Sequence, residues 1–136
     1  VVGRSPPEEL VELAKADENY HVHGFVDDIR SVFHKAGIYV CPISDGGGTK
    51  LKILDALAMG KPIVANEIAC EGIEVIEGRN VLFAETPEEY VNKIHELIES
   101  PTLRAELSEE NIKLILGKYS YSVVGQQLLK LLENKG

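Results

Sequence analysis

Short apolar runs alternate with longer amphipathic stretches along the chain before Pro101. The runs rich in β-branched or aromatic residues are 1–2, 20–23, 38–41, 63–65 and 81–83. Apolar positions recur at helical spacing between these runs, at about 7–16, 28–35, 49–59 and 87–99. Strands and helices that alternate on this scale form βαβ units with a parallel sheet covered on both faces. The pattern predicts an α/β fold.

Local signals mark where the helices begin and end. Ser5 and Thr86 each precede proline and two glutamates, so each is predicted to cap a helix. Asp27 or Asp28 can cap the second helix, and Gly60 can end the third in the left-handed conformation. Beyond Pro101 the pattern is purely helical and predicts a helical tail at about 101–136, in helices at about 101–117 and 121–134. The apolar stripe of the second helix is expected to pack onto another surface; it consists of Val123, Val124, Leu128, Leu131 and Leu132.

Composition narrows the possible functions. The 136 residues suit a single domain, and the formal charge of −8 argues against a nucleic-acid partner, because nucleic-acid binders present a basic face. Cys41 and Cys70 lie far apart without metal-ligand spacing, so we expect free thiols and no metal site. No apolar run is long enough to span a bilayer, and the sequence predicts a cytoplasmic protein.

The most informative stretch is 45–65, where a glycine turn precedes a helix and a strand. Glycines let the backbone approach a ligand, and the amides of Gly47, Gly48 and Thr49 at a helix N-terminus can donate to a phosphate. Lys50 and Lys52 could neutralise its charge. The simpler alternative is a glycine turn followed by an exposed Lys52–Asp55 ion pair.

Helical geometry gives Asp55 a specific place in this hypothesis. A helix that starts near Thr49 puts Lys52 and Asp55 on one outward face, while residues 51, 54 and 58 share a face that can enter the core. Asp55 then lies about 9 Å along the axis from Thr49, which is the span from a diphosphate to a ribose. Its carboxylate could accept hydrogen bonds from both ribose hydroxyls.

The order of these motifs resembles the C-terminal, donor-binding domain of GT-B glycosyltransferases, in the retaining group called family four. The resemblance covers nearly the whole chain, and its most specific part is Lys-Ile-Leu-Asp-Ala-Leu-Ala-Met-Gly-Lys-Pro-Ile-Val at 52–64. The other matching segments are Gly-Arg-Ser-Pro-Pro-Glu-Glu-Leu at 3–10, His-Gly-Phe-Val-Asp-Asp-Ile at 23–29, Val-Cys-Pro-Ile at 40–43, Glu-Gly at 71–72, Asn-Val-Leu-Phe at 80–83 and Tyr-Ser-Tyr at 119–121. The resemblance implies a Rossmann-like, doubly wound parallel sheet.

This resemblance also implies roles for individual residues. Asp55 takes the place of the second acidic residue of a Glu-x7-Glu motif, which binds the ribose diol. Gly47 stands where the first acidic residue would be, and Asp45 is a candidate substitute for it. Gly47, Gly48 and Thr49 would bind the diphosphate, and the backbone of Phe25 and Val26 would contact the base. Arg4 and Glu71 are further candidates, each of which could equally face solvent.

Relatives carry an earlier strand, with a Gly-Arg turn and a lysine that hold the diphosphate, before the stretch that matches Val1. Because that strand is central in the 3-2-1-4-5-6 order, its absence predicts a fragment with an exposed sheet edge that could self-associate. The acceptor pocket and the usual catalytic histidine belong to the N-terminal domain of relatives, so we expect no catalytic residue in this chain. That missing domain could also place the protein at the inner membrane face.

The resemblance therefore predicts the donor-binding domain of a retaining glycosyltransferase of hexosyltransferase type. Its parent would transfer a sugar from a nucleotide diphosphate sugar, which is a substrate, and no cofactor is implied. Two alternatives stay open: a non-catalytic nucleotide-binding or assembly module, and another GT-B enzyme such as a nucleotide-sugar epimerase. Fold analogy leaves the donor, the acceptor and the pathway open.

Overall fold

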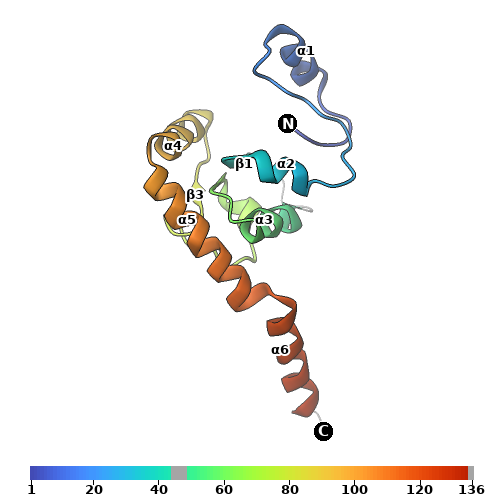
Figure 1. Ribbon diagram of the computed structural model, residues 1–136, viewed down its shortest axis with the longest axis vertical. Coiled ribbons are helices and arrows are strands. Elements are labelled where there is room, and N and C mark those ends of the chain that lie inside the picture. The colour runs from blue at the N-terminus through green and yellow to red at the C-terminus, as the bar shows by residue number, and fades with distance from the viewer. Residues whose placement is uncertain (44–48, 135–136) are drawn as a thin grey trace. The chain divides into compact units, whose positions relative to one another are not determined.

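The computed structural model describes residues 1–43 and 49–134, and Figure 1 labels most of their helices and strands. The chain divides into two compact units, Val1–His34 and Lys35–Gly136. We call them the N-terminal unit and the C-terminal unit.

The N-terminal unit contains little regular structure besides helices. Helix α1 spans Glu8–Ala16, and α2 spans Arg30–Lys35. The strands predicted at 1–2 and 20–23 are reduced to one parallel bridge between Val2 and His23. The amide of His23 donates to the carbonyl of Val1 at 2.8 Å, and the amide of Gly3 donates to that of His23 at 3.3 Å. Two neighbouring segments thus run in parallel without forming a sheet.

One of the two predicted caps in this unit is wrong. The N-cap of α1 is Pro7, and no side chain caps the helix. Ser5 instead adopts the left-handed conformation, with φ of 49°. Ser5 lies two residues before this N-cap, so its hydroxyl is not in the capping position. Asp28 does mark the start of α2, because its carboxylate accepts the backbone amide of Arg30 at 3.0 Å.

The C-terminal unit contains a parallel sheet of three strands in the order β1-β2-β3. Strands β1, Tyr39–Cys41, and β2, Ile63–Ala65, pair over three residues, with Val40 opposite Val64. Strand β3, Leu82–Phe83, pairs with the other side of β2. The predicted α/β class is confirmed. On its outer side, β1 pairs with no strand in the part of the chain that the structure describes.

Helices connect these strands and follow them. Helix α3, Thr49–Ala58, follows β1, and the 3₁₀ helix η1, Glu67–Cys70, follows β2. Helices α4, Pro87–Glu99, and α5, Pro101–Leu114, come after β3. A π-helical turn, η2, Ile115–Tyr119, leads to α6, Tyr121–Glu133. The helices expected at 49–59, 87–99, 101–117 and 121–134 are present, whereas η1 and the π-helical turn were not predicted.

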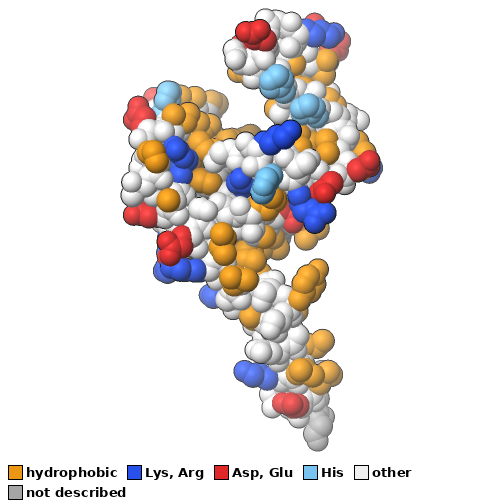
Figure 2. Space-filling view, in the orientation of Figure 1, with side chains coloured by type: hydrophobic (Ala, Val, Ile, Leu, Met, Phe, Trp, Pro, Cys, Tyr) orange, Lys and Arg blue, Asp and Glu red, His pale blue; other side chains and the backbone are white. Residues whose placement is uncertain are grey.

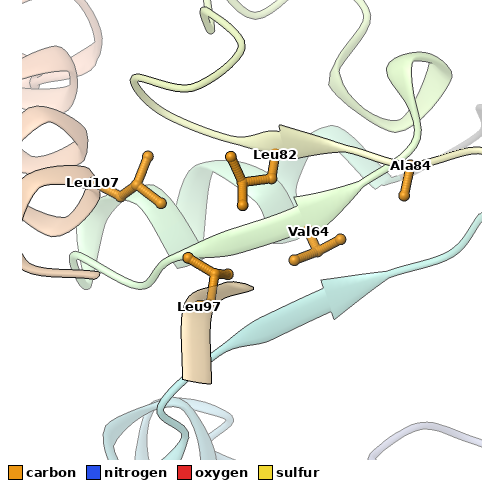
Figure 3. Packing of buried hydrophobic residues seen from close by; sticks show 5 residues of the cluster. All are labelled: Val64, Leu82, Ala84, Leu97 and Leu107. Atoms are coloured by element: carbon orange, nitrogen blue, oxygen red, sulfur yellow. The ribbon is translucent and has the colours of Figure 1, made fainter. Parts of the chain in front are cut away.

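The core of the C-terminal unit lies on both faces of its sheet. Figure 3 shows Leu97 of α4 and Leu107 of α5 beside Val64 and Leu82 of the strands, with Ala84 just beyond β3. Successive strand residues point to opposite faces, so Ile63 and Ala65 point away from this cluster. They are fully buried together with Ile53, Ala56 and Leu57 of α3. Helices therefore cover the two faces of a short parallel sheet.

Two of the predicted helix boundaries in the C-terminal unit are confirmed. Gly60 follows α3 with φ of 64°, and a Cβ there would lie 2.8 Å from the hydroxyl of Ser108. Thr86 caps α4: its side chain accepts the amide of Glu89, whose carboxylate accepts the amide of Thr86, each at 3.2 Å. Both signals concern only local backbone, which is why the sequence was enough to locate them.

The stripe expected to pack onto another surface is exposed over most of its length. Helix α6 has no buried residue. Figure 2 shows hydrophobic side chains gathered along this C-terminal helix. The large exposed ones are Tyr121, Val124, Leu128, Leu129, Leu131 and Leu132.

Candidate functional site

Helix α3 carries the side chains that the sequence singles out most strongly. Its buried positions are Ile53, Ala56 and Leu57, so the core face predicted from 51, 54 and 58 is wrong. Leu51 is 73% exposed. The face that packs on the sheet lies nearly opposite the predicted face, and both faces carry apolar residues, so helical spacing alone does not decide which one is buried.

Lys52 and Asp55 have exposed side chains, as the spacing predicts. They lie close to β1. Burial is the main cause of the raised pKa of Tyr39, and the negative charge of Asp55 adds to it. Burial likewise raises the pKa of the Cys41 thiol, which the charge of Lys52 partly offsets. The charges of Lys52 and Asp55 therefore act on the strand that precedes α3, while Tyr39 and Cys41 on that strand stay uncharged.

The backbone that leaves β1 is held by side chains from two other elements. The hydroxyl of Tyr90, on α4, donates to the carbonyl of Cys41 at 3.3 Å. The side-chain amide of Asn66, directly after β2, donates to the carbonyl of Ile43. Sequence reasoning missed Tyr90 and Asn66, because neither belongs to a motif.

The second cysteine, Cys70, is buried in η1, and burial raises the pKa of its thiol to about 11.

Of the remaining site residues predicted in the C-terminal unit, Thr49, Lys50 and Glu71 lie among the described residues. Asp45, Gly47 and Gly48 lie outside the described residues. Thr49 and Lys50 form the first helical positions of α3, so the start predicted for this helix is correct. Glu71 is exposed and follows η1, with its amide donating to the carbonyl of Ile68 at 3.3 Å.

The N-terminal unit brings two predicted residues together. The guanidinium of Arg4 lies 4.8 Å from the centroid of the Phe25 ring, which is a cation–π arrangement. Phe25 is 63% exposed, and Val26 is half-buried. The pairing follows from the Val2–His23 bridge, which places residues just beyond it side by side. Arg4 thus contacts an aromatic ring, which the sequence did not predict.

Within residues 1–43 and 49–134, no group of three or more histidine, cysteine, aspartate or glutamate side chains is placed to hold a metal ion. None of the described helices combines the length and the apolar character that crossing a bilayer requires.

Comparison with known proteins identifies the family. The family model described as "Glycosyl transferases group 1" matches residues 1–100. The chain belongs to the group 1 glycosyl transferases. It is 34% identical over 97 residues to an uncharacterized glycosyltransferase of Methanocaldococcus jannaschii, a match that covers 70% of this chain and 27% of that protein. The chain thus corresponds to about a quarter of the length of this relative.

A solved structure supports the fold of this glycosyl transferase chain. The C-terminal domain of a glycosyl transferase group 1 family protein from Francisella tularensis superposes with a TM-score of 0.68. The match covers 84% of this chain and 60% of that one, at 24% sequence identity. The fold predicted from the resemblance, that of the C-terminal half of a GT-B glycosyltransferase, is confirmed.

Proposed function

We propose that this chain binds the nucleoside diphosphate part of a nucleotide sugar for a retaining glycosyltransferase of hexosyltransferase type. The observation that carries the proposal is the exposed pair of Lys52 and Asp55 on α3, beside the strand that precedes this helix. Ligands of doubly wound folds bind beyond the carboxyl ends of the strands, and α3 begins after the carboxyl end of β1.

The chemistry of the pair suits the two ends of such a ligand. Asp55 is a carboxylate that can accept hydrogen bonds from ribose hydroxyls. The first amides of α3 and the ammonium of Lys52 favour a diphosphate, as does the dipole of the helix. In sugar transfer the bond from the anomeric carbon to the diphosphate oxygen breaks while a bond to an acceptor oxygen forms. Positive charge at this place stabilises the negative charge that develops on the departing diphosphate.

Other parts of the proposal come from the family resemblance. They include base contacts by the backbone of Phe25 and Val26, diphosphate contacts by Thr49 and Lys50, and a separate acceptor domain in the full-length enzyme. We expect the chain by itself to bind a nucleoside diphosphate and to transfer no sugar.

Calorimetric titration of the chain with UDP, GDP and ADP tests the proposal. We expect saturable binding of one of them and a Kd at least tenfold higher for Asp55→Asn, because a carboxylate that binds hydroxyls loses its charge. Glu99→Gln is the matched control, since it removes one exposed carboxylate from the end of α4.

A second ligand assigns the contact to the ribose. Wild type should bind the 2′-deoxy form of the nucleotide more weakly than the nucleotide itself. Asp55→Asn should bind the two forms about equally. No saturable binding of any of the three nucleotides to wild type would contradict the proposal. An equal effect of Asp55→Asn and Glu99→Gln would contradict the role of Asp55.

A further inference from the structure

Two side chains from distant parts of the chain hold the backbone that leaves β1. Asn66 lies 23 positions after Ile43, and Tyr90 lies 49 positions after Cys41. Each donates a hydrogen bond to the carbonyl of its partner. Two of the three residues from Cys41 to Ile43 are thereby fixed through main-chain atoms. Contacts of this kind set the path of the chain whatever the side chains at 41–43 are.

The side chain of Asn66 is buried with one of its two polar atoms unpaired among the described residues. It is 7% exposed, and its Oδ1 atom is buried without a hydrogen-bond partner in the described part of the chain. A buried acceptor without a donor is destabilising, and an apolar side chain of similar size would avoid that loss. Residues that break such a rule are expected at functional positions.

Tyr90 holds the same stretch of backbone through a different carbonyl, that of Cys41. Its ring packs against the core cluster that includes Val64 and Leu82, so the hydroxyl is held at the carboxyl end of the strands. Burial raises the pKa of Tyr90 to about 12, although a backbone hydrogen bond from Asn66 lowers it. The hydroxyl therefore remains a neutral donor near pH 7, and it lies between the backbones of Cys41 and Asn66.

We propose that Asn66 and Tyr90 are positioning residues for the donor site, which fix the backbone at 41–43 from which the chain continues to α3. The inference rests on the proposed function of α3. A diphosphate held by backbone amides and by Lys52 gains affinity only if these groups are in place before it binds. Core packing of Ile53, Ala56 and Leu57 fixes α3 at one end of the connection, and the two hydrogen bonds fix β1 at the other.

The first test removes only the hydroxyl of Tyr90. We expect Tyr90→Phe to raise the Kd of the bound nucleoside diphosphate about tenfold, which is what the loss of one positioning hydrogen bond allows. Tyr121→Phe is the matched control, because Tyr121 is 99% exposed and begins α6. Amide hydrogen exchange at Cys41 and Ile43, without nucleotide, should become faster in Tyr90→Phe and stay unchanged in Tyr121→Phe.

The second test separates positioning from a merely structural role. Asn66→Leu removes both the donor to Ile43 and the unpaired oxygen, so the urea midpoint of unfolding should change little while the Kd rises about tenfold. A structural role would make the two quantities change together. Unchanged affinity in both Tyr90→Phe and Asn66→Leu, with wild type binding normally, would overturn the inference and leave the proposed function intact. Failure of wild type to bind any nucleoside diphosphate would overturn both.

Discussion

The two units of the chain each bring two extended segments into parallel register, with different results. In the N-terminal unit the segments meet at the Val2–His23 bridge. In the C-terminal unit β1 and β2 pair over three residues and β3 extends the sheet. All three residues of β2 are fully buried, whereas His23 is exposed.

The difference shows that burial converts a strand-forming sequence into a sheet. Val1, Val2, Tyr20 and Val22 have high strand propensity, yet Phe33 alone is buried in 1–34, all of which the structure describes. Parallel strands are stable when helices cover both of their faces, as α3 and α4 do for β2. Strand propensity largely measures such packing, so its effect is weak where the packing is missing.

The largest expected effect compares one leucine from each unit. Leu107→Ala opens a cavity in the core cluster and should lower the free energy of unfolding by about 3 kcal/mol. Leu13→Ala, at an exposed position of α1, should cost less than about 1 kcal/mol. Urea unfolding followed by circular dichroism measures both. Equal costs would show that the two units are equally well packed and would break the comparison.

Glycine substitutions measure how tightly the C-terminal unit is packed. Gly60→Ala should cost about 2 kcal/mol, because φ is 64° and the new Cβ would lie 2.8 Å from Ser108 and 2.9 Å from Ile112. Gly78→Ala is the control, with φ of 77° and no heavy atom within 4 Å of the new Cβ, and should cost about 1 kcal/mol. The difference in unfolding free energy between the two variants isolates packing from backbone strain. No difference would mean that the α3–α5 contact relaxes freely.

The caps predicted at Thr86 and Ser5 give a smaller difference in stability between the two units. Thr86→Ala removes a capping hydrogen bond from α4 and should cost about 1 kcal/mol in thermal or urea unfolding. Ser5→Ala removes no cap from α1 and should stay within about 0.5 kcal/mol of wild type. A comparable loss in both variants would show that Ser5 caps its helix after all.

The same capping box should make α4 sensitive to acid. Backbone hydrogen bonds from Glu85 and then Thr86 lower the pKa of Glu89. A lowered folded pKa stabilises the fold above the unfolded value of about 4.3, and this contribution is lost as the pH falls through the folded pKa. Glu89→Gln should therefore flatten the pH dependence of the unfolding midpoint below about pH 5. An unchanged slope would contradict the assignment.

The smallest expected effect is a gain in the N-terminal unit. Ser5→Gly relieves a left-handed backbone of φ 49° and should stabilise this unit by about 0.5 kcal/mol after the entropic cost of glycine. Slower amide exchange at Gly3 and His23, whose amides form the bridge hydrogen bonds, would report the gain. Faster exchange would mean that the Ser5 side chain contributes to the turn.

Much of the fold was predictable because its signals are local. The caps at Thr86 and Gly60 and the start of α3 at Thr49 depend on a few consecutive residues. The buried face of α3 was not predictable from the sequence. Leu51 and Leu57 are equally apolar, and only the position of the sheet decides which one is covered. The same holds for the candidate site. The outward spacing of Lys52 and Asp55 followed from helical geometry, whereas the hydrogen bonds of Asn66 and Tyr90 did not.

The sequence by itself determined the α/β class, the helices, the family resemblance and the common outward face of Lys52 and Asp55. Periodicity, capping and motif order are all written in neighbouring residues. The tertiary structure decided which apolar runs became a sheet, which face of α3 is buried, and that Arg4 meets Phe25. It also decided that Asn66 and Tyr90 hold the backbone leaving β1. These contacts join residues far apart in the chain, and burial, which no local pattern specifies, selects them.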